Sequence, residues 1–293
     1  MPAAAPRVAV VGHVEWVTFA RVPHVPRGGE VMHARRPFSE PAGGGAVAAV
    51  QLARLAGSAV LFTALGDDEH GRQAESRLGA LGVEVRAARR PRPTRTAVTL
   101  VDDAGERTIT TFGPRLEPTG SDAELGWADL AAMDAVYFTA GDLDALRAAR
   151  AGRVLVASPR AIDALGAGVG LDALVLSAHD AVELGELAQA RDEAALVALT
   201  EGERGGSYTR RAGASGRWSA AALPGPPVDS YGCGDSFAAG LAYGLGAGIG
   251  IADALRLAAR CGAVCLTGRG PYERQLTLHG HDSAPGAATN LTP

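Results

Sequence analysis

The sequence contains no lysine, because all 28 basic residues among its 293 are arginines. This absence excludes mechanisms that use a lysine Schiff base, and it excludes a complete GxxxxGK[ST] phosphate-binding loop. Asparagine is nearly absent as well, since Asn290 is the only one. Whole classes of enzyme mechanism are therefore ruled out before any motif is considered.

Cysteine is scarce, and an odd number of three without CxxC spacing (Cys233, Cys261 and Cys265) indicates neither a disulfide framework nor a zinc knuckle. No apolar run approaches the roughly 20 residues that a membrane span needs, and Met1 to Ala5 is too short and uncharged for a signal peptide. The net charge of -4 offers no basic footprint for nucleic acid. We expect a cytoplasmic protein that has neither a membrane nor a nucleic-acid partner.

Apolar residues make up 47% of the chain and charged residues 20%, which is typical of a folded globular protein. Short apolar runs alternate with segments of helical periodicity. This alternation predicts an α/β fold with a mostly parallel sheet flanked by helices. We expect strands within 7–11, 59–66, 134–141, 153–158, 172–177 and 195–202, and helices at 44–55, 69–81, 143–150 and 180–187.

Two segments interrupt the alternation. Residues 14–38 are strand-like but contain prolines and glycines, and residues 94–112 read as a β-hairpin with a turn near Asp103 to Gly105. Together they predict a small β-lid beside the main sheet, because antiparallel strands need no crossover helix. The tail, 279–293, is expected to be mobile, with its two histidines solvated.

The stretch VDSYGCGDSFAAGLAYGLGAG, residues 228–248, places a glycine turn before an apolar helix. Such a turn directs free amides outward, where the helix dipole also favours an anion. Asp235 has two interpretations at this point. It is a helix N-cap, or it accepts a proton during phosphoryl transfer while the amides of 232–235 hold the transferred group.

Within this stretch, DSYGCGDSFAAG resembles the C-terminal signature D-T-x-G-A-G-D of the ribokinase-like (PfkB) carbohydrate kinases. Asp229, Gly232, Gly234 and Asp235 match, whereas Cys233 replaces Ala and Ser replaces Thr. The resemblance implies that Asp235 is the catalytic base and that Gly232, Cys233 and Gly234 contribute amides to an anion hole. It also implies a kinase that transfers the γ-phosphoryl group of ATP to a hydroxyl of a sugar or nucleoside.

Further blocks follow the order of that family from about residue 7 to 276. They are PAGGGAVAAVQLARLAG (41–57), TALGDDEHGRQAESRLGALGVEV (63–85), TRTAVTLVDDAGERT (94–108) and LTEGERGGSY (199–208). The resemblance therefore implies a single ribokinase-like α/β domain over residues 1–293. Dimerisation through the lids is expected, because a small sheet has edges that a second copy can cover.

The resemblance also implies where ATP and its metal bind. Thr200, Gly202 and Gly205 match the nucleotide loop, although an ordinary strand-end turn would read the same. Ser177 and Asp180 fall on the N-x-x-E motif of the family, so Asp180 is a candidate magnesium ligand or the cap of a following helix.

The substrate end departs from the family pattern. Glu15 and Val17 stand where the family often has Asn and Asp, and Ala48 stands near another Asn. Glu15 is a candidate to replace one of the lost contacts, and Gly43 and Gly44 remain candidate substrate contacts. Trp16 either stacks on the substrate or packs in the lid. Loss of the polar anchors at positions 17 and 48 argues against ribose and favours a nucleoside or a modified sugar.

Three further interpretations stay open. Asp229 is a candidate ligand for a monovalent cation such as K⁺. The arginines between Arg86 and Arg95 are solvated lid charges, or one of them meets a substrate phosphate. Two other functions compete with the kinase: a non-catalytic nucleotide or sugar sensor, and a nicotinamide-dependent dehydrogenase, which is disfavoured because no GxGxxG follows Gly12.

Overall fold

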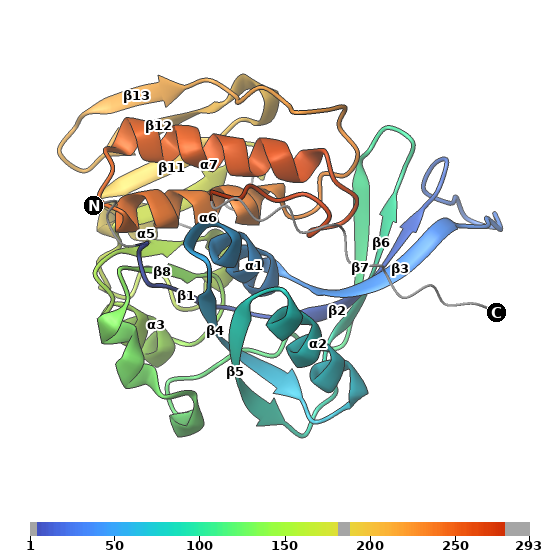
Figure 1. Cartoon of the computed structure of the whole chain (residues 1–293), viewed down its shortest axis with the longest axis horizontal. Helices are drawn as coiled ribbons and strands as arrows, with labels where there is room; N and C mark the ends of the chain where they lie inside the picture. The colour runs from blue at the N-terminus through green and yellow to red at the C-terminus, as the bar shows by residue number, and fades with distance from the viewer. Residues whose placement is uncertain (1–4, 181–187, 279–293) are drawn as a thin grey trace.

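The computed structural model, which describes residues 5–180 and 188–278, contains two β-sheets (Figure 1). The larger sheet has nine strands in the order β13-β12-β11-β10-β9-β8-β1-β4-β5. Its strands are β1 (Val8–Val11), β4 (Ala59–Gly66), β5 (Val83–Arg90), β8 (Ala135–Phe138), β9 (Leu155–Ala157), β10 (Ala173–Ser177), β11 (Leu196–Thr200), β12 (Gly206–Arg210) and β13 (Ser215–Trp218). All pairings from β11 to β5 are parallel, and only β12 and β13 at one edge are antiparallel.

Helices cover both faces of this sheet, as the alternating pattern predicts. The inner strand β1 shows why, because Val8 and Val10 pack into one hydrophobic cluster and Ala9 and Val11 into another on the opposite face. The first cluster contains buried residues of α1 (Gly44–Ala56), α2 (Glu69–Ala80), α6 (Cys233–Gly246) and α7 (Ile251–Leu266). The second contains residues of α3 (Leu143–Ala149), α5 (Ala188–Glu193) and the 3-10 helices 123–125, 127–132 and 159–161.

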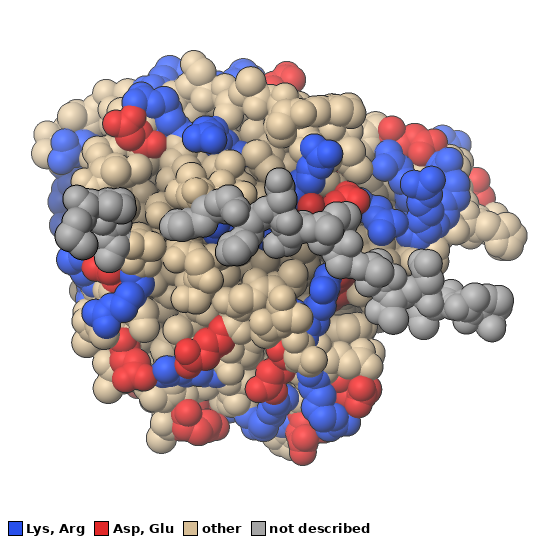
Figure 2. All heavy atoms as spheres, viewed as in Figure 1, with Lys and Arg blue, Asp and Glu red and all other residues tan. Residues whose placement is uncertain are grey.

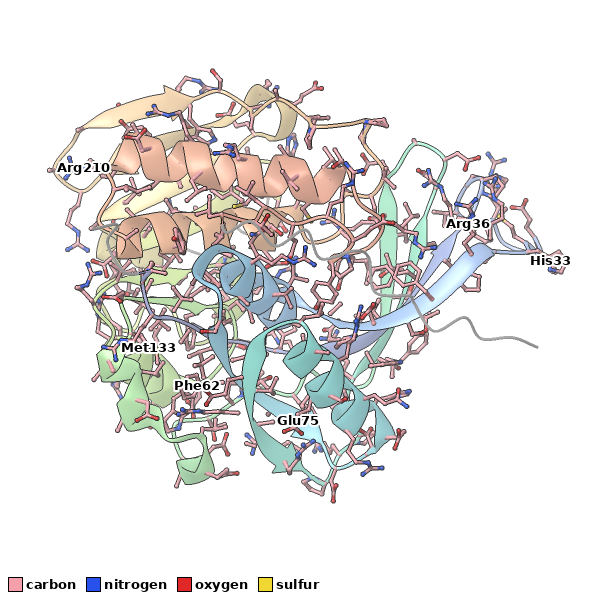
Figure 3. All side chains as sticks on the ribbon, viewed as in Figure 1. His33, Arg36, Phe62, Glu75, Met133 and Arg210 are labelled. Carbon is pink, nitrogen blue, oxygen red and sulfur yellow. The ribbon has the colours of Figure 1, made fainter. Side chains whose placement is uncertain are left out.

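The second sheet has four strands in the order β3-β2-β6-β7 and extends away from the helical layers (Figure 1). They are β2 (Glu15–Arg21), β3 (Arg35–Ala42), β6 (Thr96–Val101) and β7 (Arg107–Phe112). The hairpin within 94–112 is confirmed, with its turn at Gly105, whose amide donates to Asp102. His33 and Arg36, which are labelled in Figure 3, lie at the outer end of this sheet.

The small sheet is attached directly to the main one. Only three residues separate the end of β1 from the start of β2, so the base of the small sheet lies beside the carboxyl end of a central parallel strand. Its inner strands β2 and β6 are parallel, with Trp16 opposite Thr96, and the outer pairings are antiparallel. The position therefore places the small sheet over the edge where open parallel sheets bind ligands.

Most predicted elements are confirmed within a residue or two of their ends, but some expectations need correction. Residues 86–90 belong to β5 of the large sheet rather than to a lid. The antiparallel strands β12 and β13 and the helix α7 were not predicted. The predicted helix at 180–187 and the tail 279–293 lie outside the described residues, apart from Asp180. Within 5–180 and 188–278, no helix is long and apolar enough to span a bilayer.

Candidate active site

The candidate site is built around the first turn of α6. Gly232 is the N-cap, with a φ of 80°, and it supplies no capping side chain. The first N–H groups of a helix lack intrahelical acceptors, so amides in this turn can meet a ligand, although that of Cys233 also donates to the carbonyl oxygen of Ser230 at 3.5 Å. A Cβ on Gly232 would lie 2.9 Å from Val47 Cγ1, so this turn requires glycine both for its φ and for close packing against α1. The predicted glycine turn before an apolar helix is thus present, and its binding of an anion stays a prediction.

Asp235 lies inside this first helical turn and is not the N-cap. The interpretation of Asp235 as a capping residue is therefore wrong, because Gly232, three residues earlier, occupies the cap position. The Asp235 carboxylate is partly buried, and burial raises its pKa. The charges of Arg160 and Arg107 and a hydrogen bond with Tyr137 oppose that rise. A carboxylate with these surroundings is a plausible proton acceptor.

Gly44 lies so close to this carboxylate that a side chain at position 44 would crowd it. A Cβ at Gly44 would lie 2.9 Å from Asp235 Oδ1, 3.1 Å from Thr139 Oγ1 and 3.4 Å from His13 Cε1. These groups come from α1, α6 and the segments after β8 and β1, so four separate parts of the chain meet around one point. The structure thereby brings the predicted substrate residue Gly44 next to the predicted base.

Hydrogen bonds hold the start of α1 in this position. The amide of Gly44 donates to His13 Nε2 at 3.2 Å, and the amide of Gly43 donates to the Tyr231 hydroxyl at 3.2 Å. Because Nε2 of His13 accepts, the ring proton lies on Nδ1. Burial lowers the pKa of His13, and nearby arginine charges lower it further, so the ring is neutral. The two predicted glycines thus lie between β1 and the signature turn.

Glu15 and Trp16, the other predicted substrate residues, begin β2. Glu15 is buried and forms an ion pair with Arg95, whose Nη1 lies 3.1 Å from Oε1. Burial raises the pKa of Glu15, and the charge of Arg95 is the largest opposing effect. Trp16 stacks on His70 of α2 with ring centroids 5.4 Å apart. This contact favours a packing role for Trp16 over substrate stacking.

The predicted nucleotide residues lie at the carboxyl ends of two adjacent strands. Ser177 of β10 is paired with Thr200 of β11, and both strands end there. Gly202 and Gly205 follow with φ values of 61° and 81°. A Cβ on Gly205 would lie 2.1 Å from the carbonyl oxygen of Trp218, so this glycine is required by close backbone approach whatever the loop binds. The structure brings these four residues together along one edge.

Asp229 ties the signature turn to the C-terminal loop. Its buried carboxylate accepts hydrogen bonds from the amides of Tyr231 and Gly270, each at 2.9 Å. Both oxygens are therefore engaged, although each retains lone pairs for a cation. Among the residues that the structure describes, no group of three or more His, Cys, Asp or Glu side chains could hold a metal. Magnesium often uses only one or two carboxylates beside phosphates and water, so Asp180 alone fits such a role.

The Cys233 thiol packs against other groups of the protein. Its Sγ interacts with Cys265, and this hydrogen bond together with burial raises the pKa of the Cys233 thiol. Cys265 Sγ in turn lies 3.4 Å from the Tyr231 carbonyl oxygen. The side chain therefore fills space behind the turn. The backbone amide of Cys233 donates to the carbonyl oxygen of Ser230 at 3.5 Å, a long contact that a bound anion would have to replace.

Sequence reasoning missed several polar groups that surround Asp235 and Glu15. Thr139 and Ser158 follow β8 and β9, and their hydroxyls are hydrogen-bonded at 2.9 Å. Polar residues at the ends of predicted parallel strands were a usable signal for both. The remaining missed groups are His13, Tyr137, Arg107, Arg115 and Arg160.

The architecture places the chain in a class: a mostly parallel nine-stranded sheet covered by helices, with a small second sheet, is the ribokinase-like α/β fold. A family profile described as pfkB family carbohydrate kinase matches residues 5–277. The chain therefore belongs to the pfkB family of carbohydrate kinases.

Solved structures show the same fold at low sequence identity. An Arabidopsis thaliana ribokinase complexed with ribose and ATP is 20% identical, with a TM-score of 0.72 over 91% of this chain and 94% of that one. An adenosine kinase from Sinorhizobium meliloti is 20% identical, with a TM-score of 0.74 over 92% and 96%. A microbiome-derived acarbose kinase is 25% identical, with a TM-score of 0.75 over 93% and 96%. No curated protein matches the sequence.

Proposed function

We propose that this protein is an ATP-dependent kinase that transfers the γ-phosphoryl group to a hydroxyl of a sugar or nucleoside. One observation carries the proposal: the Asp235 carboxylate and the amides of the α6 N-terminus belong to the same helical turn, beside Gly44, which has no side chain to crowd Asp235. Phosphoryl transfer needs these two elements together, because its catalysis consists mainly of positioning and electrostatic stabilisation. Membership of a carbohydrate kinase family supports the same activity.

In this proposal Asp235 accepts the proton of the attacking hydroxyl, and the amides of Gly232, Cys233, Gly234 and Asp235 stabilise charge on the transferred group. Bound ATP supplies the phosphoryl group, and Mg²⁺ neutralises its phosphates. Gly43 and Gly44 leave room for the acceptor next to Asp235, with Glu15 at its far side and Trp16 supporting the wall.

Thr200, Gly202, Gly205 and Ser177 are proposed to contact ATP, and Asp180 to hold Mg²⁺. Their common position at the ends of β10 and β11 supports this assignment. Asp229 is proposed as part of a K⁺ site, since its carboxylate joins the signature turn to the loop at Gly270.

The small sheet is proposed to be a lid that excludes water from the reacting groups. Arg107 of β7 supports this role, because its Nη1 lies 2.9 Å from both the carbonyl oxygen and the Oγ of Ser230 in the signature turn. The same proposal includes one domain for the whole chain, a cytoplasmic location and a homodimer joined through this sheet. Ile109 and Phe112 on the edge strand β7 are exposed apolar side chains that a second copy would cover.

A non-catalytic sensor of the same fold is the second candidate. It is favoured by Val17 and Ala48, which are fully buried and occupy positions of missing polar anchors. The retained Asp235 and the open first turn of α6 argue for catalysis instead.

The test is release of ADP from Mg-ATP against a panel of sugars and nucleosides. We expect one acceptor class to stimulate ADP release well above the rate without acceptor, because the lid and the base act only on a bound hydroxyl. Phosphorylated product, measured by mass, confirms transfer over hydrolysis. Measurable nucleotide binding without transfer to any acceptor would instead establish the sensor.

A further inference from the structure

Three arginines from separate elements surround the acceptor side of the candidate site. Arg95 precedes β6, Arg115 follows β7, and Arg160 lies in the 3-10 helix after β9. Arg95 forms the ion pair with Glu15. Arg115 pairs with Glu117 through Nε, and its Nη2 donates to the carbonyl oxygen of Arg160 at 2.9 Å. The chain has therefore brought three guanidinium groups to one place from positions distant in sequence.

All three charges act on the same two buried residues. Burial lowers the pKa of His13, and Arg115, Arg160 and Arg95 lower it further. Burial raises the pKa of Glu15, and the same three arginines oppose that rise. The region around His13 and Glu15 is thus a place of positive potential, which favours a negatively charged ligand.

Two buried nitrogens in this region are donors without a protein acceptor. Arg95 Nε and His13 Nδ1 have no hydrogen-bond partner among the residues described. Nδ1 is a donor because Nε2 of the same ring accepts from Gly44. Leaving buried donors unpaired costs free energy, so a ligand that presents acceptor atoms would satisfy them.

Acceptor groups for sugar hydroxyls are few by comparison. Val17 and Ala48 are fully buried members of the hydrophobic core, at positions where polar anchors are otherwise expected. Glu15 is the remaining carboxylate of β2, and Arg95 already lies beside it. A neutral polyol needs partners that accept its hydroxyl protons, whereas phosphate and carboxylate groups only accept. The balance of donors and acceptors therefore suits an anion.

Binding of the ATP phosphates would explain the positions of only some of these arginines. Arg160 and Arg107 act on Asp235, next to the transferred group, whereas Arg95 and Arg115 act on His13 and Glu15.

Basic side chains also gather at the end of the small sheet in Figure 2. There Arg35 pairs with Asp103 at 2.7 Å, but both side chains are more than half exposed, so water screens that pair.

We propose that the acceptor is an anionic sugar, carrying a phosphate or a carboxylate group that Arg95 and Arg115 bind with the help of Arg160. This inference rests on the proposed kinase function and names its substrate class. The anion binds on the His13 and Glu15 side, and the hydroxyl to be phosphorylated lies at Asp235. Arg95 and Arg115 therefore determine which acceptors are used.

The experiment compares matched acceptors with Mg-ATP: fructose with fructose 1-phosphate and fructose 6-phosphate, and glucose with gluconate. We expect kcat/KM for an anionic acceptor to exceed that of its neutral partner by about 10-fold to 100-fold, as expected for hydrogen bonds to a charged group. The phosphate and gluconate arms distinguish a sugar phosphate from a sugar acid.

Arg95→Gln and Arg115→Gln should each remove most of that preference, by about 10-fold in kcat/KM for the anionic acceptor, and leave ATP affinity unchanged. The matched control is Arg147→Gln, because Arg147 pairs with Asp144 within α3 and both side chains are more than half exposed. Thermal unfolding of each variant checks the fold, and Arg115→Gln tests the proposal even if Arg95→Gln, which breaks the buried pair with Glu15, does not fold.

Equal use of neutral and anionic acceptors, unchanged in Arg115→Gln, would overturn the anionic acceptor and leave the kinase in place. Stimulation of ADP release by no acceptor of either charge, from protein that binds ATP, would remove the kinase function, and the inference would be lost with it. These two failures are distinct because only the second abolishes transfer to neutral acceptors.

Discussion

Replacing Asp235 with Asn should reduce acceptor-dependent turnover by roughly 100-fold to 10,000-fold, the range expected for loss of a general base. The change removes proton acceptance and keeps the shape of the side chain. It should not weaken the fold. Burial raises the pKa of Asp235, which means that its ionised form costs stability in the folded protein. Asn carries no charge, so the unfolding temperature at neutral pH should equal or exceed that of the wild type.

The pH dependence of the wild type provides an independent check. A base must be deprotonated, so kcat/KM should fall as the pH drops through a pKa above the ordinary aspartate value of 3.8. Arg160, Arg107 and Tyr137 limit the rise. The matched control is Asp142→Asn, since Asp142 caps α3 by accepting from the amide of Ala145, a role that Asn also fills. Near-normal turnover in Asp235→Asn would refute the assignment of the base.

The signature turn could be predicted from sequence because its determinants are local. The alternation of Gly232, Gly234 and Asp235 within four residues specifies a positive φ, a free helix start and an acid in one turn. Its exact cap could not be predicted, because Asp and Gly are both accepted at that position. The choice of Gly232 depends on its contact with Val47 of α1, which sequence patterns do not contain.

The positions of strands could be predicted only for the buried parallel part of the sheet. Apolar runs such as 8–11 and 135–138 are buried on both faces and stand out from their surroundings. By contrast, β13 is largely exposed and polar, and β5 alternates in burial with several arginines on it. Their sequences do not differ from those of solvated loops, which explains why Arg86 to Arg90 were misassigned to a lid.

The arginine cluster could not be predicted for a different reason. Arg95, Arg115 and Arg160 are separated by at least 20 residues, and each follows or precedes a strand whose neighbours are determined by the whole sheet. Among 28 basic residues, nothing local distinguishes these three from arginines that form surface ion pairs. Their convergence is a tertiary property, and it is the part of the site that determines the acceptor.

Gly234 provides the sharpest test of the anion-binding turn. An ideal Cβ at Gly234 would have no other atom within 4 Å, so larger residues fit there without a clash. Gly234→Ala retains the amide N–H and should leave turnover near that of the wild type. Gly234→Pro removes the N–H, and proline is tolerated in the first turn of a helix. Loss of one such donor should lower turnover by about 100-fold to 1,000-fold.

The comparison of these two variants separates the amide from the side chain. Proline restricts the preceding Cys233, so thermal unfolding is measured for both proteins, and a small decrease is acceptable for Gly234→Pro. The decisive quantity is the acceptor-dependent kcat of folded protein. A donor that stabilises charge in the transition state should lower kcat more than it raises the KM for ATP. If Gly234→Pro instead kept wild-type kcat, the amide of residue 234 would have no part in stabilising the transferred phosphoryl group, and Asp235 would act without this donor.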